Sequence, residues 1–164
     1  MLKNQSIQEL SWIWSFTEED AVAIARVLNT NQTLQKLKLS GYSIDYFGAS
    51  AIAAALEQNQ TLQTLELNIK GCHAKSGYIA IQLTNQTLRK LVLCNTNFEL
   101  DAVAAIASAL KTNRSLRVLK LEYTTLDDKG AIAISEALQT NATLRTLKIV
   151  SAIVGAQRAM VIAS

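Results

Sequence analysis

One short sequence pattern recurs at nearly constant spacing, and this repeat constrains the fold of the chain more than any other feature. A threonine or serine is followed by Leu-x-x-Leu-x-Leu or a near copy, starting at Thr33, Thr61, Thr87, Ser115 and Thr143. The starts are 28, 26, 28 and 28 residues apart, and a weaker sixth copy begins at Ser6. Periods of about 20–50 residues are typical of solenoids, in which stacked repeats share one core. We therefore expect one repeat domain over residues 1–164, with about six repeats and a truncated last one.

Each repeat predicts a short strand followed by a helix. Leu37 and Leu39 alternate with polar residues, as in a strand with one buried face. A run of helix formers follows, as in residues 49–56, and we expect the asparagine after each run to end the helix in a left-handed conformation. The pattern predicts helices near residues 18–29, 48–57, 75–83, 101–111 and 128–139. The third copy is two residues short, so we expect an irregularity there that Gly71 and Gly77 absorb.

Strands and helices in this order predict a curved α/β solenoid. Recurring strand–helix units give parallel strands with right-handed crossovers. Strands lie about 4.8 Å apart, whereas packed helices need roughly 8–10 Å. We therefore expect a horseshoe arc, with the parallel β-sheet on the concave side and the helices on the convex side.

The chain resembles the leucine-rich-repeat family, in particular its ribonuclease-inhibitor-like class with 28-residue, helix-containing repeats. Gly-Ala before two helices, at Gly48 and Gly130, matches that class. All fifteen slots of the five complete triplets are apolar: Leu34/Leu37/Leu39, Leu62/Leu65/Leu67, Leu88/Leu91/Leu93, Leu116/Leu119/Leu121 and Leu144/Leu147/Ile149. The family usually carries Asn or Cys three residues after each triplet, but here the slots hold Tyr42, Lys70, Thr96, Thr124 and Ala152. We expect the loop edge to be held less tightly than in the family.

The resemblance implies a non-enzymatic scaffold that binds a protein partner through its concave face. The family also includes Ran GTPase-activating proteins, and short arrays look like those in effectors of intracellular bacteria. Regulation of a small GTPase, or action as a bacterial effector in a host cell, are therefore the alternatives. We expect a cytoplasmic protein, or one delivered into a host cell if it is an effector.

The candidate binding residues are charged side chains that flank the leucines and point away from the core. They are Lys36, Lys38, Glu66, Arg89, Lys90, Arg117, Lys120, Glu122, Arg145 and Lys148. Their excess of positive charge predicts an acidic protein partner. The alternative interpretation is that exposed lysines and arginines only keep the strands soluble. Cys94 is expected on the same face, where only Lys90 or Lys120 is placed to activate its thiol.

Catalytic, metal, cofactor, nucleic-acid and membrane functions are not expected. His73, the single histidine, adjoins Cys72 without further ligands, and neither a P-loop nor Gly-x-Ser-x-Gly occurs. The net charge of +3 is too small to imply nucleic acid by itself, and few aromatic residues interleave with the basic ones. The chain lacks the roughly 18 consecutive apolar residues of a membrane span, and its first residues lack the apolar region of a signal peptide.

The two ends of the array carry separate predictions. Trp12 is expected in the core, while Trp14 and Phe16 are expected to cap the first repeat. The last repeat is expected to stop partway through a helix and leave its strand uncovered. The chain is then either part of a longer protein or forms a weak end-to-end homodimer. Six Asn-x-Ser/Thr sequons, at Asn4, Asn31, Asn59, Asn85, Asn113 and Asn141, are explained by the repeat, and glycosylation is not expected.

Overall fold

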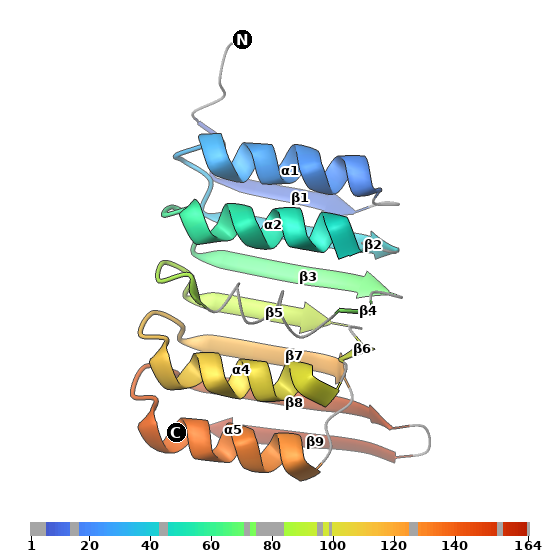
Figure 1. The fold of residues 1–164 in the computed structure, drawn as a ribbon, viewed down its shortest axis with the longest axis vertical. Helices are drawn as coiled ribbons and strands as arrows, with labels where there is room; N and C mark the ends of the chain where they lie inside the picture. The colour runs from blue at the N-terminus through green and yellow to red at the C-terminus, as the bar shows by residue number, and fades with distance from the viewer. Residues whose placement is uncertain are drawn as a thin grey trace.

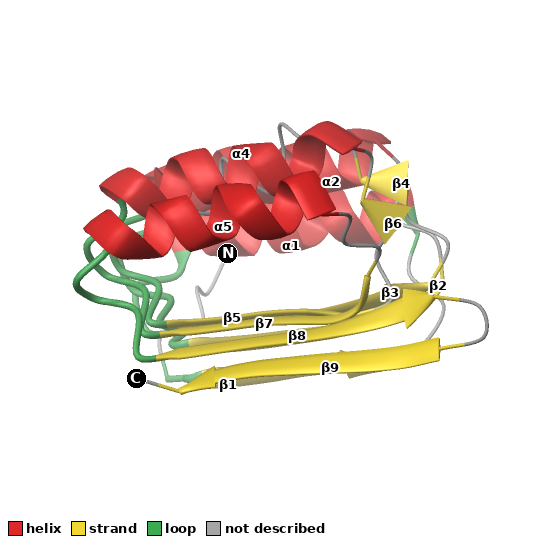
Figure 2. Ribbon diagram, turned by 90° about the horizontal axis from the view of Figure 1, so that it is seen from below, coloured by secondary structure: helices red, strands yellow, loops and turns green. Residues whose placement is uncertain are grey.

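The computed structural model of the chain is a curved sheet with the described helices on one face (Figures 1 and 2). It describes residues 6–13, 17–42, 46–70, 73–74, 84–94, 97–98, 100–124, 128–153 and 156–163.

Seven strands of the described chain form one sheet in the order β1-β2-β3-β5-β7-β8-β9. Their bounds are β1 (Glu9–Ile13), β2 (Lys36–Tyr42), β3 (Thr64–Lys70), β5 (Lys90–Cys94), β7 (Val118–Thr124), β8 (Thr146–Ile153) and β9 (Ala156–Ala163). The first six are parallel, with one strand from each repeat, as the sequence predicts. The middle leucine of every triplet lies in register with the next, in the column Leu10, Leu37, Leu65, Leu91, Leu119 and Leu147.

Four helices in the described residues cover the same face of this sheet (Figure 2). They are α1 (Glu18–Thr30), α2 (Tyr46–Gln58), α4 (Leu100–Thr112) and α5 (Asp128–Thr140), and each confirms a predicted helix. Helix α1 begins with a capping box, in which Thr17 Oγ1 accepts from the Asp20 N–H and the Thr17 N–H donates to Asp20 Oδ2. The predicted helix over 75–83 and the two glycines beside it, Gly71 and Gly77, lie outside the described residues.

The sheet bends away from the helices at both ends. Figure 2 shows β1 and β9 farther from the helical layer than the central strands β5 and β7. The face without helices is therefore the concave one, as expected from the wider spacing of packed helices. A small second sheet pairs β4 (His73–Ala74), which follows β3 in the chain, with β6 (Asn97–Phe98), which follows β5.

The core lies between sheet and helices and consists mainly of the repeated leucines. The middle leucines Leu37, Leu65, Leu91 and Leu119 are fully buried. Apolar residues four apart on the helices, such as Ile52 with Leu56 and Ile106 with Leu110, pack into the same cluster. The apolar side chains of the strands and those of the helices therefore form one core layer, as the sequence predicts.

The asparagine that follows each helix joins neighbouring repeats through its side chain. Asn59 Oδ1 accepts from the backbone N–H groups of Thr61 (3.0 Å) and Leu62 (2.8 Å). Its Nδ2 donates to the carbonyl of Leu28 in the preceding repeat (2.7 Å). Asn31, Asn85, Asn113 and Asn141 have equivalent acceptor bonds. The predicted left-handed conformation at the end of the helix was wrong for Asn31, whose backbone is extended (φ −84°, ψ 129°). Its side-chain oxygen accepts from the N–H of Leu34 instead.

A threonine or serine that opens a triplet also bonds to the preceding repeat at Thr33, Thr87, Ser115 and Thr143. The hydroxyl of Thr33 donates to the carbonyl of Ile7 (2.9 Å), and that of Thr87 donates to Leu62 (3.2 Å). The recurring Asn-x-Ser/Thr is thus a structural element of the turn from helix to strand. Asn4, the remaining sequon, lies outside the described residues.

Trp12 is not in the core, and that prediction was wrong. Its relative exposure is 41%, although its backbone is in register with buried Leu39. Strand β1 lies at the edge of the sheet and has one neighbouring repeat instead of two, so its inward side chains are covered from one side only. The proposed caps Trp14 and Phe16 lie outside the described residues.

The C-terminal segment forms a strand, not the start of a helix, so this prediction was also wrong. Strand β9 turns back and pairs antiparallel with β8 over its whole length, from Thr146↔Ala163 to Ile153↔Ala156. The pairing occupies the hydrogen-bonding groups on the outer edge of β8, which an unpaired edge strand would expose. An end-to-end dimer through the edge of β8 is therefore blocked by the chain itself.

Candidate functional site

The concave face carries three columns of side chains that alternate with the buried leucines. We call these columns the sheet face. They comprise Glu9, Lys36, Thr64, Lys90, Val118 and Thr146; Ser11, Lys38, Glu66, Val92, Lys120 and Lys148; and Ile13, Ser40, Asn68, Cys94, Glu122 and Val150. Most are half-buried or exposed, whereas the leucines between them are buried in β2, β3, β5, β7 and β8. The predicted outward orientation is therefore confirmed for seven of the ten candidate residues: Lys36, Lys38, Glu66, Lys90, Lys120, Glu122 and Lys148.

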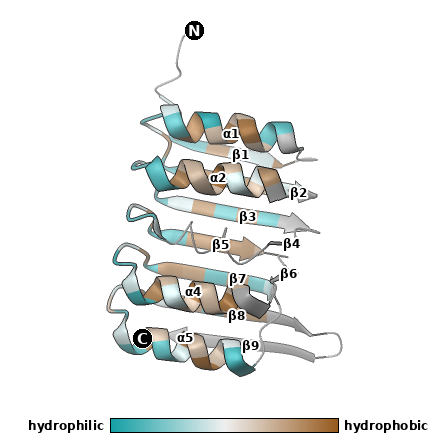
Figure 3. Cartoon of the chain, in the orientation of Figure 1, coloured by the Kyte–Doolittle hydropathy of each residue, from teal (hydrophilic) through white to brown (hydrophobic). Residues whose placement is uncertain are grey.

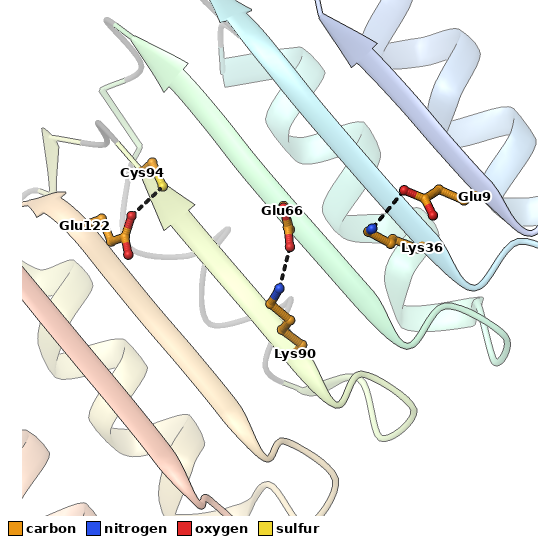
Figure 4. Close-up of polar contacts among 6 residues, drawn as sticks. All are labelled: Glu9, Lys36, Glu66, Lys90, Cys94 and Glu122. Carbon is orange, nitrogen blue, oxygen red and sulfur yellow. Dashed lines mark hydrogen bonds and ion pairs between the residues drawn. The ribbon is translucent and has the colours of Figure 1, made fainter. Parts of the chain in front are cut away.

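Ion pairs neutralise much of the charge on the sheet face. Three lysines bind carboxylates of neighbouring strands: Lys36 with Glu9 (2.8 Å), Lys90 with Glu66 (2.6 Å) and Lys148 with Glu122 (2.8 Å). Figure 4 shows the first two of these pairs crossing between strands. Within the described residues, Lys38 and Lys120 are the sheet-face lysines that form no ion pair. The positive excess predicted for this face is therefore concentrated at two positions.

The paired carboxylates are held in their charged form. The hydrogen bond from Lys90 lowers the pKa of Glu66 from its ordinary value of 4.5, against the opposing effect of burial. The hydrogen bond from Lys148 likewise lowers the pKa of Glu122. Lys38 and Lys120 add to these shifts by their charge, although neither forms an ion pair in the described part of the chain.

We expect the Lys90–Glu66 pair to make the free energy of unfolding decrease at acidic pH. A lowered folded-state pKa stabilises the fold above the unfolded-state pKa, and this stabilisation is lost as pH falls through the folded-state pKa. The loss should occur over a pH window that begins near the ordinary value of 4.5 and ends below the lowered folded-state pKa. It should amount to under about 1 kcal/mol, because the pair is partly exposed. Urea unfolding of the wild type and of Glu66→Gln should give free energies that converge as pH falls through this window. A constant difference between the two would contradict the assignment.

Cys94 is protonated on this face and is not an activated thiol. Its Sγ lies 3.6 Å from Glu122 Oε2 (Figure 4). Burial, together with the negative charge of Glu122, raises its pKa to about 11. The sequence suggested Lys90 or Lys120 as activating groups, but burial and Glu122 outweigh the opposing effect of Lys148 on the pKa of this thiol.

The three candidate arginines lie apart from the sheet face, at the edge where the strands begin. The backbone N–H of Arg117 donates to the carbonyl of Arg89, and that of Arg145 donates to Arg117, both at 2.8 Å. We call Arg89, Arg117 and Arg145 the arginine ladder, since they stack one per strand. Glutamines occupy the same positions in the earlier repeats, where Gln8, Gln35 and Gln63 are linked by the same bonds. The sequence-based set therefore divides into two separate surfaces.

The arginine ladder lines a pocket of about 460 Å³, which we call the arginine groove. Its lining residues are polar apart from one alanine: Gln60, Thr61, Gln63, Gln86, Thr87, Arg89, Arg114, Ser115, Arg117, Ala142, Thr143 and Arg145. Figure 3 shows the hydrophilic loops at this edge. Arg114 was missed from the sequence because it lies in the turn. Its Nη1 donates to the carbonyls of Lys111 (2.9 Å) and Asn113 (3.2 Å) at the end of α4.

Comparisons with known proteins agree with this architecture. The family described as "Leucine Rich repeat" matches residues 112–135, which run from the end of α4 through β7 into α5. The chain has the fold of a leucine-rich-repeat solenoid. A solved structure of "Leiomodin-1 Actin-Binding Site 2 (ABS2)" is similar to it with 24% identity and a TM-score of 0.64, over 85% of this chain and 83% of that one. A Caenorhabditis elegans tropomodulin C-terminal domain has 16% identity and a TM-score of 0.62, over 85% and 86%. None of the curated proteins matches.

The described surfaces offer hydrogen-bonding and charged side chains. No group of three histidine, cysteine or acidic side chains among the described residues is arranged to hold a metal ion. None of the described helices is long and apolar enough to cross a bilayer. What the described surfaces present is a broad array of charged side chains, suited to contact with another macromolecule.

Proposed function

We propose that this leucine-rich-repeat solenoid is a non-enzymatic scaffold that binds a protein partner through the sheet face. The observation that carries the proposal is that the concave face has no helix over it in the described structure, while the convex face is covered (Figure 2). Three columns of side chains there span six parallel strands, which gives a continuous surface of the kind that solenoids use for binding.

Charge and the structural neighbours both support a protein partner. Lys38 and Lys120 form no ion pair in the described residues, and this favours an acidic surface on the partner. One solved structure with the same fold is an actin-binding site of leiomodin-1, so a protein ligand is compatible with this architecture. We propose a cytoplasmic location, or the interior of a host cell if the chain is an effector.

Regulation of a small GTPase and action as a bacterial effector remain alternative proposals that rest on family resemblance. A GTP-hydrolysis assay with a panel of GTPases separates the first from a passive scaffold, since only a regulator changes the rate. Self-association also stays a prediction, and sedimentation of the whole chain at high concentration tests it.

We expect charge reversal of Lys38 and Lys120 to weaken partner binding. The variant Lys38→Glu/Lys120→Glu places negative charge at two sheet-face positions. Repulsion should lower the affinity for an acidic partner by at least about tenfold. The matched control Arg26→Glu/Lys129→Glu makes the same change in charge on the exposed sides of α1 and α5. Affinity capture followed by quantification of the recovered proteins compares the three forms. Equal recovery by both variants would exclude the sheet face as the binding surface.

A further inference from the structure

The arginine groove gathers positive charge that nothing in its lining compensates. Arg89, Arg114, Arg117 and Arg145 line it, and none of its lining residues is Asp or Glu. Within the described residues no ion pair involves these four arginines, in contrast to the paired lysines of the sheet face. The ladder side chains are exposed. The groove is thus a second charged surface, separate from the columns that the proposed function uses.

The spacing of the ladder defines the size of a matching ligand. Successive arginines are joined by backbone hydrogen bonds between adjacent strands, so they repeat at about 4.8 Å. Three of them span about 10 Å, which is the length of about three residues of extended chain. Guanidinium groups bind carboxylates through paired, charge-assisted hydrogen bonds. A run of three or four acidic residues fits this line of donors.

The other lining residues favour a polypeptide over a nucleic acid. No aromatic side chain lines the groove, whereas single-stranded nucleic acids are usually held by stacking on aromatic rings. The amides of Gln60, Gln63 and Gln86 and the neighbouring hydroxyls can both donate and accept hydrogen bonds. Such groups match the alternating N–H and C=O of a peptide backbone lying across the strand ends.

We propose that the arginine groove binds a short acidic segment of a polypeptide, with Arg89, Arg117 and Arg145 binding its carboxylates and the groove amides binding its backbone. The inference rests on the proposed function, since it identifies a feature of the protein partner. It adds a second contact surface, at the edge of the sheet, beside the sheet face.

The test measures binding of a fluorescein-labelled peptide with four consecutive glutamates, by fluorescence anisotropy. The ladder variant Arg89→Gln/Arg117→Gln/Arg145→Gln should fold, because Gln8, Gln35 and Gln63 occupy the same positions in the earlier repeats. Circular dichroism and thermal unfolding confirm that it does. We expect affinity to fall by at least about tenfold in this variant and to fall with added salt. The control Arg26→Glu/Lys129→Gln lowers the net charge by the same three units at exposed positions of α1 and α5, and it should stay within about twofold of the wild type.

Four results would overturn the proposal. Equal loss in the ladder variant and its control would mean that only net charge matters. Equal binding of a peptide with four glutamines would mean that carboxylates are not recognised. Tripolyphosphate or an oligothymidine that binds more tightly than the acidic peptide would assign the groove to phosphate ligands or nucleic acid. If a protein partner is captured through the sheet face while the acidic peptide fails to bind, this inference fails and the proposed scaffold function stands.

Discussion

Replacement of Asn59 by alanine is expected to lower the free energy of unfolding by about 2–5 kcal/mol, although the residue lies in a turn. The side chain is 4% exposed, and its amide bonds the N–H groups of Thr61 and Leu62 and the carbonyl of Leu28. Alanine would leave these groups without that partner in a buried place, at a cost of about 1–3 kcal/mol each, partly relieved by relaxation. Urea unfolding followed by circular dichroism measures the loss.

Two further variants identify the cause of this effect. If Asn59 acted only as a residue suited to left-handed backbone, glycine would replace it with little loss. The hydrogen-bond interpretation predicts that Asn59→Gly costs about as much as Asn59→Ala. Asn141 makes the same bonds but is only half-buried, so Asn141→Ala should cost less. A tolerated glycine, or equal losses at the two sites, would contradict the role assigned to the amide.

The repeating elements were predictable from the sequence because each is determined by local periodicity. The leucine alternation predicted six parallel strands, and four predicted helices agree with α1, α2, α4 and α5 to within two residues at either end. Curvature followed from the different spacings of strands and helices. These features depend on sequence neighbours and on the adjacent repeat, both of which the period makes visible.

Features outside the repeat were not predictable in this way. The helix expected at the C-terminus is instead β9, because pairing with the open edge of β8 satisfies backbone groups that a helix would leave exposed. Trp12 occupies a leucine slot but lies in an edge strand, where the slot is not enclosed. The local sequence pattern predicts which face of the sheet a side chain lies on. Whether that side chain is buried depends also on how many repeats lie beside it.

The candidate site was predictable as a set of residues but not as an arrangement. The sequence identified the charged positions but not their ion pairs. Lys90 pairs diagonally with Glu66, and Lys148 with Glu122, across neighbouring strands. These pairs depend on strand register and side-chain reach, so a count of charges overstated the basicity of the sheet face. The arginines stand one position before the strands, which places them at the edge of the sheet and beside Arg114.

Replacement of Leu91 by alanine should also destabilise the fold strongly, by about 2–5 kcal/mol. Leu91 is fully buried in central β5, with Leu65 and Leu119 in register on either side, so truncation leaves a cavity enclosed by two repeats. Leu10 occupies the same slot in edge strand β1 and is only partly buried, so Leu10→Ala should cost less than half as much. Because solenoid repeats contact only their neighbours, the central loss should also split the array into halves that unfold less cooperatively. A reduced denaturant slope for Leu91→Ala, seen in urea unfolding, would accompany that loss. Equal costs at the two leucines would contradict a core built by stacking, because such a core encloses a slot only where repeats lie on both sides of it.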